Sequence, residues 1–278
     1  MILVIYIGSQ TIDFCIRNFK SINMTGIVLS GGGARGFAHV GVLKALHEMG
    51  IKPGIISGTS SGAVMGAYYS AGFNFDDIIE KVKNTELFSF KAFSLFKQGL
   101  FNTISVRKYF EKHLLNFSFE QLNVPLVVAA TDFQTGKSCY FSKGSLIPAL
   151  LASSAIPVLY QPVVIDEMTL VDGGLSNNFP LEPISSSCDI IIGVHVNPLH
   201  NVDVNHLGIS SVIDRSLHLA IANSANRKRQ QCSVFIEPPQ LVNYGMFDMD
   251  HAEEIAAIGY NYTMQLRMEI EKCFASIK

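Results

Sequence analysis

The residues best suited to covalent chemistry lie in the pentapeptide Gly58-Thr59-Ser60-Ser61-Gly62. A serine with glycine two positions away on either side is typical of a nucleophile on a sharp turn between a strand and a helix, because the tight backbone excludes larger side chains. The helix after such a turn directs free N–H groups toward the serine, which favours a negative charge there. The pentapeptide alone is equally typical of a Gly/Ser-rich loop, so its context must decide.

A second glycine-rich segment begins where a short apolar strand is expected to end. It consists of Gly31, Gly32, Gly33, Ala34, Arg35 and Gly36. The spacing Gly31-x-Gly33-x-x-Gly36 matches a dinucleotide-binding fingerprint, which also requires an acidic residue about 20 residues later, at the end of the next strand. That strand is expected to end at Ser57, without a nearby carboxylate, and Glu48 comes too early. The sequence therefore disfavours a dinucleotide site.

An oxyanion hole is the other chemical use of these glycines. Glycine N–H groups at the start of a helix can bind the negative oxygen of a tetrahedral intermediate, and losing one such donor can cost on the order of 10²-fold in rate. A purely structural glycine turn would use the same residues. Arg35 would hold the loop, bind an anionic head group or remain solvated, and the sequence leaves these three roles open.

A carboxylate that could activate the serine is found in Val171-Asp172-Gly173-Gly174. An aspartate before two glycines commonly just begins a turn. A serine nucleophile nevertheless needs a base, and active-site residues of open α/β sheets gather at strand ends. A free aspartate, with a pKa of about 3.9, is a weak base. This interpretation therefore requires that partial burial raise the pKa of Asp172, or that proton transfer be concerted with attack.

A histidine base is the alternative. The chain has eight histidines: His39, His47, His113, His195, His200, His206, His218 and His251. In an α/β-hydrolase the histidine follows the serine and the acid, and His195 and His251 come late enough. His195 lies in a strand-like run and is expected to be packed at or near its end, whereas His251 opens a helix. The 59 residues before Ser60 also hold less sheet than that fold usually has before its nucleophile.

Composition excludes several classes of protein. The 278 residues are 48% hydrophobic and 16% charged, so the chain can bury a large core. The net charge of −2 argues against nucleic acid as a partner. The five cysteines are scattered and include no Cys-x-x-Cys pair, which argues against disulfides and a zinc site. We therefore expect no nucleic-acid partner, no metal and a reducing compartment.

The first 23 residues lie outside the regular pattern. They open with the apolar run MILVIYIG, which is too short to span a bilayer and has no basic residues ahead of it. Residues 1–23 are interpreted as an N-terminal extension, either an extra strand or a loosely held segment, or as a misassigned start before Met24. No other segment has an uninterrupted apolar run of transmembrane length.

The hydrophobic pattern from residue 25 onward predicts strands alternating with helices, which indicates parallel strands with helical crossovers. Strands are expected at 25–30, 55–57, 125–131, 137–141, 163–165, 169–171, 188–196 and 234–236. Helices are expected at 37–49, 63–71, 145–153, 207–226 and 252–274. In the first helix an apolar stripe is formed by Val40, Leu43, Leu46 and Met49, and Gly50 ends the helix.

Two further segments have a structural and a functional interpretation. Residues 87–101 hold five phenylalanines interleaved with Lys91 and Lys97. Such an aromatic stripe is most often core, but this one could also form a lid or a peripheral membrane contact. The basic run at 227–229 ends a predicted helix, where a solvated cap is expected.

The glycine loop, the serine turn and the Asp-Gly-Gly motif occur in an order that resembles the patatin-like phospholipases, particularly small single-domain bacterial members. The motifs read SGGGARGFAHVGVL, GTSSG about 25 residues later, and DGG far downstream. The resemblance implies an α/β fold with three α/β/α layers and a mostly parallel central sheet, as one domain over residues 24–278. It also implies a Ser–Asp dyad without histidine or metal, in which Ser60 is the nucleophile and Asp172 the base. Oxyanion donors are implied around Gly32, Gly33 and Ala34.

The function implied by the resemblance is a serine acyl hydrolase of lipase or phospholipase A type. It would cleave acyl esters of a lipid or phospholipid through an acyl-enzyme, with no cofactor, in the cytoplasm or at the inner membrane surface. An acyltransferase with the same nucleophile is one alternative, although malonyl-type transferases place histidine where Thr59 stands. A non-catalytic lipid-binding or nucleotide-binding relative is the other. The head group, acyl chain and oligomeric state are left open.

Overall fold

The computed structural model describes residues 24–85, 104–157, 159–199, 201 and 209–275. Two sequence predictions lie outside these residues: the interpretation of residues 1–23 and that of the phenylalanine-rich segment at 87–101.

Eight strands in the described residues form one sheet, in the order β5-β6-β3-β2-β1-β7-β8, and β4 also pairs with β3. The strands are β1 (Thr25–Leu29), β2 (Ile55–Thr59), β3 (Leu126–Asp132), β4 (Ser138–Phe141), β5 (Val163–Ile165), β6 (Met168–Asp172), β7 (Ile190–Val194) and β8 (Val234–Ile236). The central run β3-β2-β1-β7-β8 is parallel, and β4, β5 and β6 are antiparallel to their partners. The predicted mostly parallel sheet is therefore confirmed.

The register of three neighbouring strands determines where the serine and the aspartate lie. Thr59, at the end of β2, is paired with Ala129 of β3. Asp172, at the end of β6, is paired with Ala130 of the same strand. Ser60 and Asp172 therefore leave the sheet on either side of one short stretch of β3.

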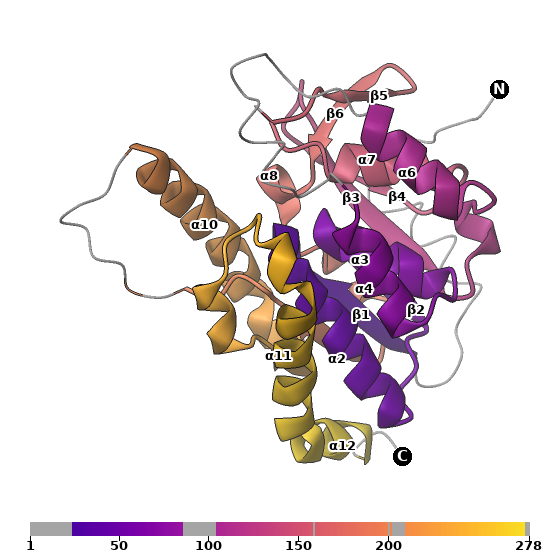
Figure 1. Ribbon diagram of the computed structural model, residues 1–278. Helices are drawn as coiled ribbons and strands as arrows, with labels where there is room; N and C mark the ends of the chain where they lie inside the picture. Colours follow the sequence, from indigo (N-terminus) through magenta and orange to yellow (C-terminus); the bar gives the residue numbers. More distant parts are fainter. Residues whose placement is uncertain (1–23, 86–103, 158, 200, 202–208, 276–278) are drawn as a thin grey trace.

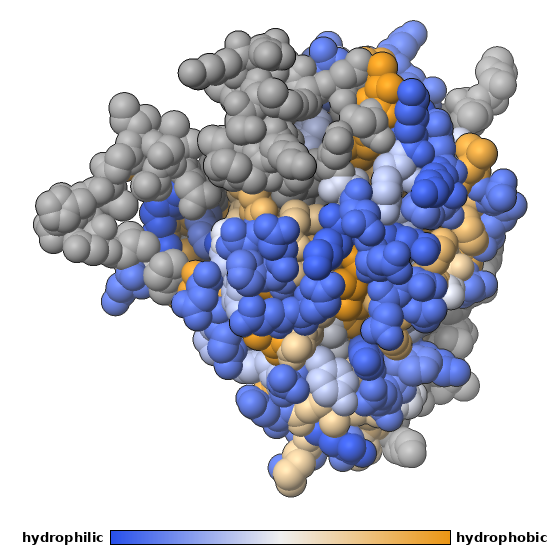
Figure 2. Space-filling view, viewed as in Figure 1, coloured by the Kyte–Doolittle hydropathy of each residue, from blue (hydrophilic) through white to orange (hydrophobic). Residues whose placement is uncertain are grey.

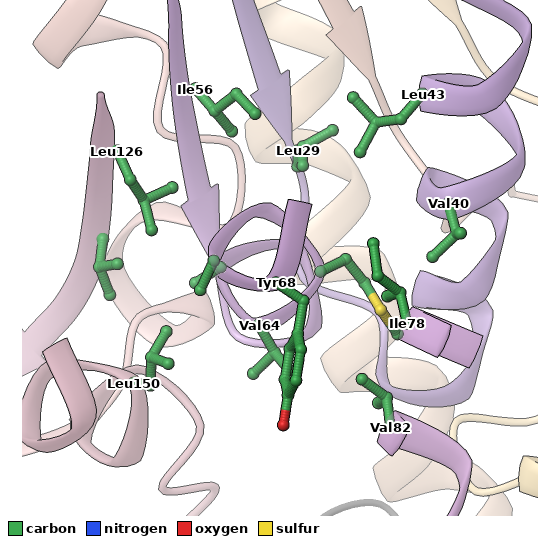
Figure 3. Packing of buried hydrophobic residues seen from close by; sticks show 14 of the residues in the cluster. Leu29, Val40, Leu43, Ile56, Val64, Tyr68, Ile78, Val82, Leu126 and Leu150 are labelled. Carbon is green, nitrogen blue, oxygen red and sulfur yellow. The ribbon is translucent and has the colours of Figure 1, made fainter. Parts of the chain in front are cut away.

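Side chains along the central strands alternate between two cores, because successive residues of a strand point to opposite faces. On one face, Ile27, Leu29 and Ile56 join the larger core, which the helices of that side cover. On the other face, Val28 and Ile55 join a smaller core with residues of α9 and α10. Figure 3 shows part of the larger core, in which side chains from α2, α3 and α4 pack with those from β1, β2 and β3. The two cores give the three predicted layers.

Ten α-helices surround the sheet in the described residues (Figure 1). They are α2 (Phe37–Glu48), α3 (Ser61–Ser70), α4 (Phe75–Lys83), α6 (Ile104–Leu114), α7 (Leu146–Ser153), α8 (Gly174–Asn177), α9 (Glu182–Ser185), α10 (Ile209–Lys228), α11 (Ala252–Gln265) and α12 (Arg267–Ala275). Hydrophilic side chains dominate the outer face of the layer that holds α2 and α11, with hydrophobic ones between them (Figure 2).

Helices α2 and α11 cross in close contact (Figure 1). Two glycines make this possible, one on each helix. A Cβ atom on Gly41 would lie 1.8 Å from the carbonyl oxygen of Ala256, and one on Gly259 would lie 2.2 Å from that of Ala38. Backbone therefore meets backbone at the crossing, and α2 is buried around most of its circumference rather than along the single predicted stripe.

The structure corrects several predicted boundaries. The helix predicted at 252–274 is divided at Leu266, whose N–H is shared between the carbonyls of Tyr262 and Thr263. The division allows Ile270 of α12 to enter the larger core. Helices α4, α6, α8 and α9 had not been predicted. The serine turn is tighter than the predicted 58–62, because β2 continues through Thr59 and α3 begins at Ser61.

We predict that Gly41→Ala destabilises the protein by about 1–3 kcal/mol, although alanine is the better helix former, because the new methyl group meets backbone that cannot move independently. Urea unfolding measures the change. Gly66→Ala in α3 is the matched control. There the nearest atoms to a Cβ are side-chain methyls of Ile56, Leu126 and Leu29, at 3.1, 3.2 and 3.5 Å, and a cost below about 1 kcal/mol is expected. Equal costs for the two substitutions would contradict the proposed tight crossing.

Candidate active site

Ser60 occupies a strained turn between β2 and α3. Its φ of 51° lies in the left-handed region, which is uncommon for a residue with a side chain. The two glycines of the motif permit the turn: a Cβ on Gly62 would lie 2.3 Å from the carbonyl oxygen of Leu29, and one on Gly58 would lie 2.7 Å from the N atom of Ala63. These close backbone contacts explain why both positions require glycine, as the sequence predicted. Strain of this kind is often retained at functional sites.

Asp172 is the last residue of β6, and its side chain is buried. The Ser60 side chain lies close enough to its carboxylate to lower the pKa of Asp172. Oδ1 of Asp172 accepts the Gly174 N–H at 2.7 Å. Burial raises the pKa of Asp172 to about 6, against the opposing effects of the Gly174 N–H and the Ser60 side chain. The rise in pKa that the sequence interpretation required is therefore present.

The two glycines after Asp172 are required by close contacts. A Cβ on Gly173 would lie 2.4 Å from the carbonyl oxygen of Ala129, where β3 passes the turn. One on Gly174 would lie 2.9 Å from Oδ1 of Asp172, which would obstruct the N–H bond to the same oxygen. The Asp-Gly-Gly motif thus folds tightly against β3 and supplies a donor to its own carboxylate.

The glycine loop lies beside the serine. A Cβ on Gly31 would lie 3.2 Å from Cβ of Ser60, and one on Gly36 would lie 2.5 Å from Oγ of Ser61. The first residue of the loop is bound to Asn178, because Gly31 donates its N–H to the Asn178 carbonyl at 3.1 Å. Ala34 donates its N–H to the Met246 carbonyl at 2.8 Å.

Two loop N–H groups remain as donors for a ligand. Within the described residues, the N–H groups of Gly32 and Gly33 have no hydrogen-bond acceptor. The Gly31 carbonyl accepts from the side-chain amides of Asn178 and Asn197, at 3.2 and 2.6 Å. The C=O and N–H of a trans peptide point in opposite directions, so these two amides direct the Gly32 N–H away from themselves. The candidate donors are therefore Gly32 and Gly33. Ala34, which the prediction also included, already donates its N–H to Met246.

Arg35 is buried and is held by residues distant in sequence. Its Nε donates to the Tyr244 carbonyl at 2.7 Å, and its Nη1 lies 3.2 Å from Oδ1 of Asn197 and 2.7 Å from Nε2 of His218. Of the three roles that the sequence left open for Arg35, these contacts support holding the loop. Solvation is excluded by the burial of the side chain, which is only 5% exposed.

The two histidines weighed for a triad have other contacts. Nδ1 of His195 lies 2.7 Å from Oε1 of Glu237, and the ring packs against Phe179 and Phe235. The His251 ring lies against Tyr244. In the described part of the chain, no hydrogen bond of Ser60 or Asp172 involves a histidine.

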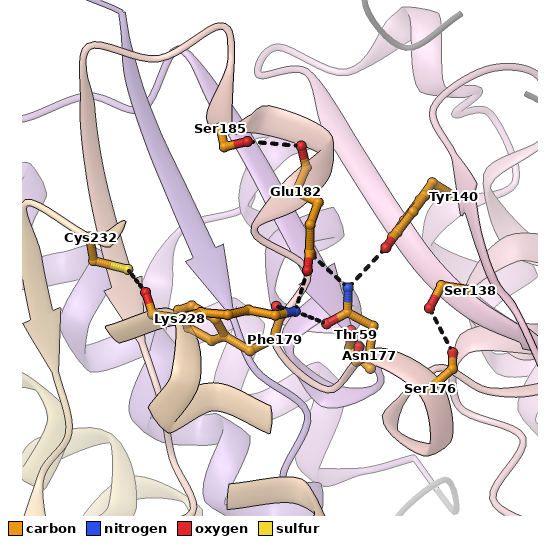
Figure 4. Close-up of polar contacts among 10 residues, drawn as sticks. All are labelled: Thr59, Ser138, Tyr140, Ser176, Asn177, Phe179, Glu182, Ser185, Lys228 and Cys232. Atoms are coloured by element: carbon orange, nitrogen blue, oxygen red, sulfur yellow. Dashed lines mark hydrogen bonds and ion pairs between the residues drawn. The ribbon is translucent and has the colours of Figure 1, made fainter. Parts of the chain in front are cut away.

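A polar cluster around Lys228 was missed in the sequence (Figure 4). Lys228, at the end of α10, was expected to be a solvated cap. Instead its Nζ contacts Oδ1 of Asn177, the Phe179 carbonyl and Oε1 of Glu182, at 2.6, 2.9 and 2.7 Å. Asn177 in turn accepts the Thr59 hydroxyl through its carbonyl. The cluster ties α10 to α8 and to the strand that precedes Ser60, and a lysine in a basic run gives no sequence signal of this role.

Two searches of the described residues gave negative results. No group of three or more His, Cys, Asp or Glu side chains is arranged to hold a metal ion. None of the helices described has both the length and the apolar character needed to cross a bilayer.

We predict that Asp172→Asn raises the melting temperature at about pH 8, by about 5 °C, because it removes a buried charge. The pKa of Asp172 is higher in the folded state, about 6, than its ordinary 3.8, so the folded protein binds the proton more tightly. Wild-type stability therefore increases as pH falls through 6, and the advantage of the variant should shrink at about pH 5.

Asp132→Asn is the control for this stability measurement. The Thr135 hydroxyl and the Gln134 N–H lower the pKa of Asp132, so its charge stabilises the folded state above the ordinary pKa. This control variant should melt below wild type at about pH 8. A lower melting temperature for Asp172→Asn at that pH would contradict the destabilising role of the Asp172 charge.

Comparisons with known proteins agree with this geometry. A family model described as patatin-like phospholipase matches residues 27–184, more than half of the chain. An uncharacterized NTE family protein of Mycobacterium tuberculosis is 34% identical over 175 residues, which cover 62% of this chain and 48% of the relative. Lysophospholipase NTE1 of Kluyveromyces lactis is 28% identical over 272 residues, covering 85% of this chain and 19% of the relative. This chain thus spans about half, or less, of the curated relatives it matches.

A solved structure shares the fold. The crystal structure of VipD from Legionella pneumophila aligns with a TM-score of 0.51 at 14% identity, over 89% of this chain and 67% of VipD. At this identity the likeness concerns the fold alone. The family match begins within β1 and covers the glycine loop, the serine turn and the Asp-Gly-Gly turn, which form the candidate site. The chain therefore belongs to the patatin-like phospholipase family.

Proposed function

We propose that this chain is a serine acyl hydrolase that cleaves acyl esters of lipids, with Ser60 as nucleophile and Asp172 as base. The observation that carries the proposal is the proximity of the Ser60 side chain to the buried Asp172 carboxylate, whose pKa it lowers. A serine hydroxyl becomes an effective nucleophile when an adjacent base accepts its proton. Here the proposed base lies beside the serine, and no histidine of the described residues is bonded to either.

The environment of Asp172 suits this role. A general base is most effective when its pKa lies near the working pH, and burial raises the pKa of Asp172 to about 6. At neutral pH the carboxylate is therefore ionised and still basic enough to take a proton as the bond to carbon forms. The Gly174 N–H holds Oδ1 in place, which fixes the orientation of the carboxylate.

Gly32 and Gly33 are the proposed oxyanion donors. Their N–H groups have no acceptor within the described residues, and the loop adjoins Ser60 at Gly31. The amides of Asn178 and Asn197 fix the Gly31–Gly32 peptide and so prepare the Gly32 N–H before substrate arrives. Fixed donors of this kind stabilise the negative oxygen without rearranging during the reaction. The N-terminus of α3 adds its dipole at the serine.

The reaction follows from these positions. Oγ of Ser60 attacks the ester carbonyl carbon while Asp172 takes the hydroxyl proton, and the carbonyl oxygen becomes negative beside Gly32 and Gly33. Collapse of the tetrahedral intermediate breaks the ester bond, and the leaving alcohol takes the proton from Asp172. The acyl group remains on Ser60. Water then attacks this ester, Asp172 accepts its proton, and the fatty acid leaves as Ser60 recovers its hydrogen. The cycle needs no cofactor.

The proposed substrate is a phospholipid or related lipid ester. The matching family is named for phospholipases, and the Kluyveromyces lactis relative is named a lysophospholipase. We propose action in the cytoplasm and at a membrane surface, where such lipids are available. The phenylalanine-rich segment at 87–101 stays a prediction for the membrane contact, because it lies outside the described residues.

We predict that a fluorophosphonate probe labels the wild-type protein and that Ser60→Ala abolishes labelling, because the probe reacts with an activated serine hydroxyl. Gel fluorescence and intact mass measure the adduct. Ser61→Ala is the control, since Ser61 is the adjacent buried serine and its hydroxyl has no partner in the described structure. It should retain labelling. Labelling of Ser60→Ala at the wild-type rate would remove Ser60 from the mechanism.

We also predict that kcat/KM for a p-nitrophenyl ester falls below about pH 6, with one proton inactivating the free enzyme, because protonated Asp172 cannot accept the serine proton. Asp172→Asn should reduce kcat by about 10²-fold or more. Circular dichroism would establish that the variant is folded. Near-normal turnover by Asp172→Asn, or a flat profile down to about pH 4, would show that another group is the base.

A further inference from the structure

The turn at the end of α7 touches both members of the proposed dyad. It consists of Ser153, Ser154 and Ala155, all buried. In Figure 1 the helix lies beside β3, with which it makes extensive contacts. The sequence predicted the helix, with Ser153 as its last residue, but assigned no role to this serine.

The Ser153 hydroxyl is inserted between the nucleophile and the sheet. Its Oγ accepts the backbone N–H of Ser60 at 2.8 Å and donates to the Ala129 carbonyl at 2.6 Å. Both of its partners are main-chain groups, and all three residues are buried. The hydroxyl therefore relays a hydrogen bond from the nucleophile's own amide to β3.

The strand register shows why such a relay is needed. Thr59 is the last residue of β2 paired with β3, opposite Ala129. The chain then turns into α3 through the positive φ of Ser60, so the two strands separate. Without Ser153, the Ser60 N–H and the Ala129 carbonyl would both be buried without a partner, which costs roughly 1–3 kcal/mol per group in proteins.

The same turn also holds the base. The Asp172 N–H donates to the Ala155 carbonyl at 2.9 Å, and the Gly173 N–H donates to the Ser153 carbonyl at 3.3 Å. Gly173 also packs against the Ala129 carbonyl, which accepts the hydrogen bond from the Ser153 hydroxyl. The backbone of the nucleophile and the backbone of the base are thus fixed to one three-residue segment.

We propose that Ser153 is a positioning residue, which holds Oγ of Ser60 at the distance and angle from Asp172 that proton transfer requires. This inference rests on the proposed function of the dyad. Ser153 touches neither substrate nor the reacting atoms, and acts only through the main chain of Ser60. Small displacements of a reacting group, on the order of 1 Å, can lower the rate about 10²-fold.

Ser154 provides a matched control. It is adjacent in sequence, equally buried, and its hydroxyl has no hydrogen-bond partner in the described structure. Ser154→Ala therefore removes the same atom from the same turn without breaking the relay. Ser153→Cys is the conservative variant, because a thiol is a weak acceptor and weak donor of similar shape.

The experiment compares wild type, Ser153→Ala, Ser153→Cys and Ser154→Ala on a p-nitrophenyl ester, with active sites titrated by the fluorophosphonate probe and at a temperature where all four are folded. We expect kcat of Ser153→Ala to fall about 10- to 100-fold with KM changed less than about threefold. Ser153→Cys should be intermediate, and Ser154→Ala should lie within about twofold of wild type. A purely structural role would lower the melting temperature but leave kcat per titrated site unchanged, and that result would overturn the proposal.

Amide hydrogen exchange at Ser60 provides a readout that does not depend on activity. Ser153→Ala should accelerate exchange of the Ser60 amide about tenfold or more relative to Ser154→Ala, because the buried acceptor is lost. Unchanged protection would overturn the positioning role even if kcat fell. A wild-type protein that neither reacts with the probe nor turns over ester would overturn the proposed function, and the exchange result would still decide whether Ser153 holds Ser60.

Discussion

The site depends on keeping one carboxylate buried next to a serine hydroxyl. A buried charge is costly unless it is hydrogen-bonded, and within the described residues the groups that compensate the Asp172 charge are the Gly174 N–H and the Ser60 side chain. Two such groups leave the carboxylate more basic than a solvated one. The surrounding fold must therefore be stable enough to tolerate an interaction that favours reactivity over stability, which is a common property of active sites. The large core on the helical side of the sheet supplies that stability.

Main-chain atoms of different elements also lie in direct contact at several glycines. The glycines at 58, 62 and 173 each lie against main-chain atoms of another element, and the α2–α11 crossing is built in the same way. Backbone groups cannot change rotamer, so such contacts fix positions more firmly than side-chain packing does. The strained φ of Ser60 persists because strands, helix α7 and the polar cluster around Lys228 all hold its surroundings.

Much of the fold and of the candidate site could be predicted from local sequence patterns. The three motifs, the parallel strands and the need for small residues follow from spacing and hydrophobicity, since these act over a few neighbouring residues. Relations between distant segments could not be predicted. The antiparallel direction of β6, which places Asp172 opposite Ala130, depends on tertiary pairing. The contacts of Arg35 with Tyr244 and His218 span about two hundred residues, and Lys228 has the composition of a surface cap although it is largely buried.

The long-range contacts of the glycine loop bear on how the site is assembled during synthesis. Ser60 and Asp172 lie in the part of the chain that matches the family, which ends at residue 184. The loop between residues 31 and 36, however, is closed by Asn197, Tyr244 and Met246. A ribosome-bound chain can therefore contain the proposed nucleophile and the proposed base before the groups that fix the loop have been made. The proposed nucleophile is therefore made early, and the contacts that fix the loop beside it form only after residue 246 has been made.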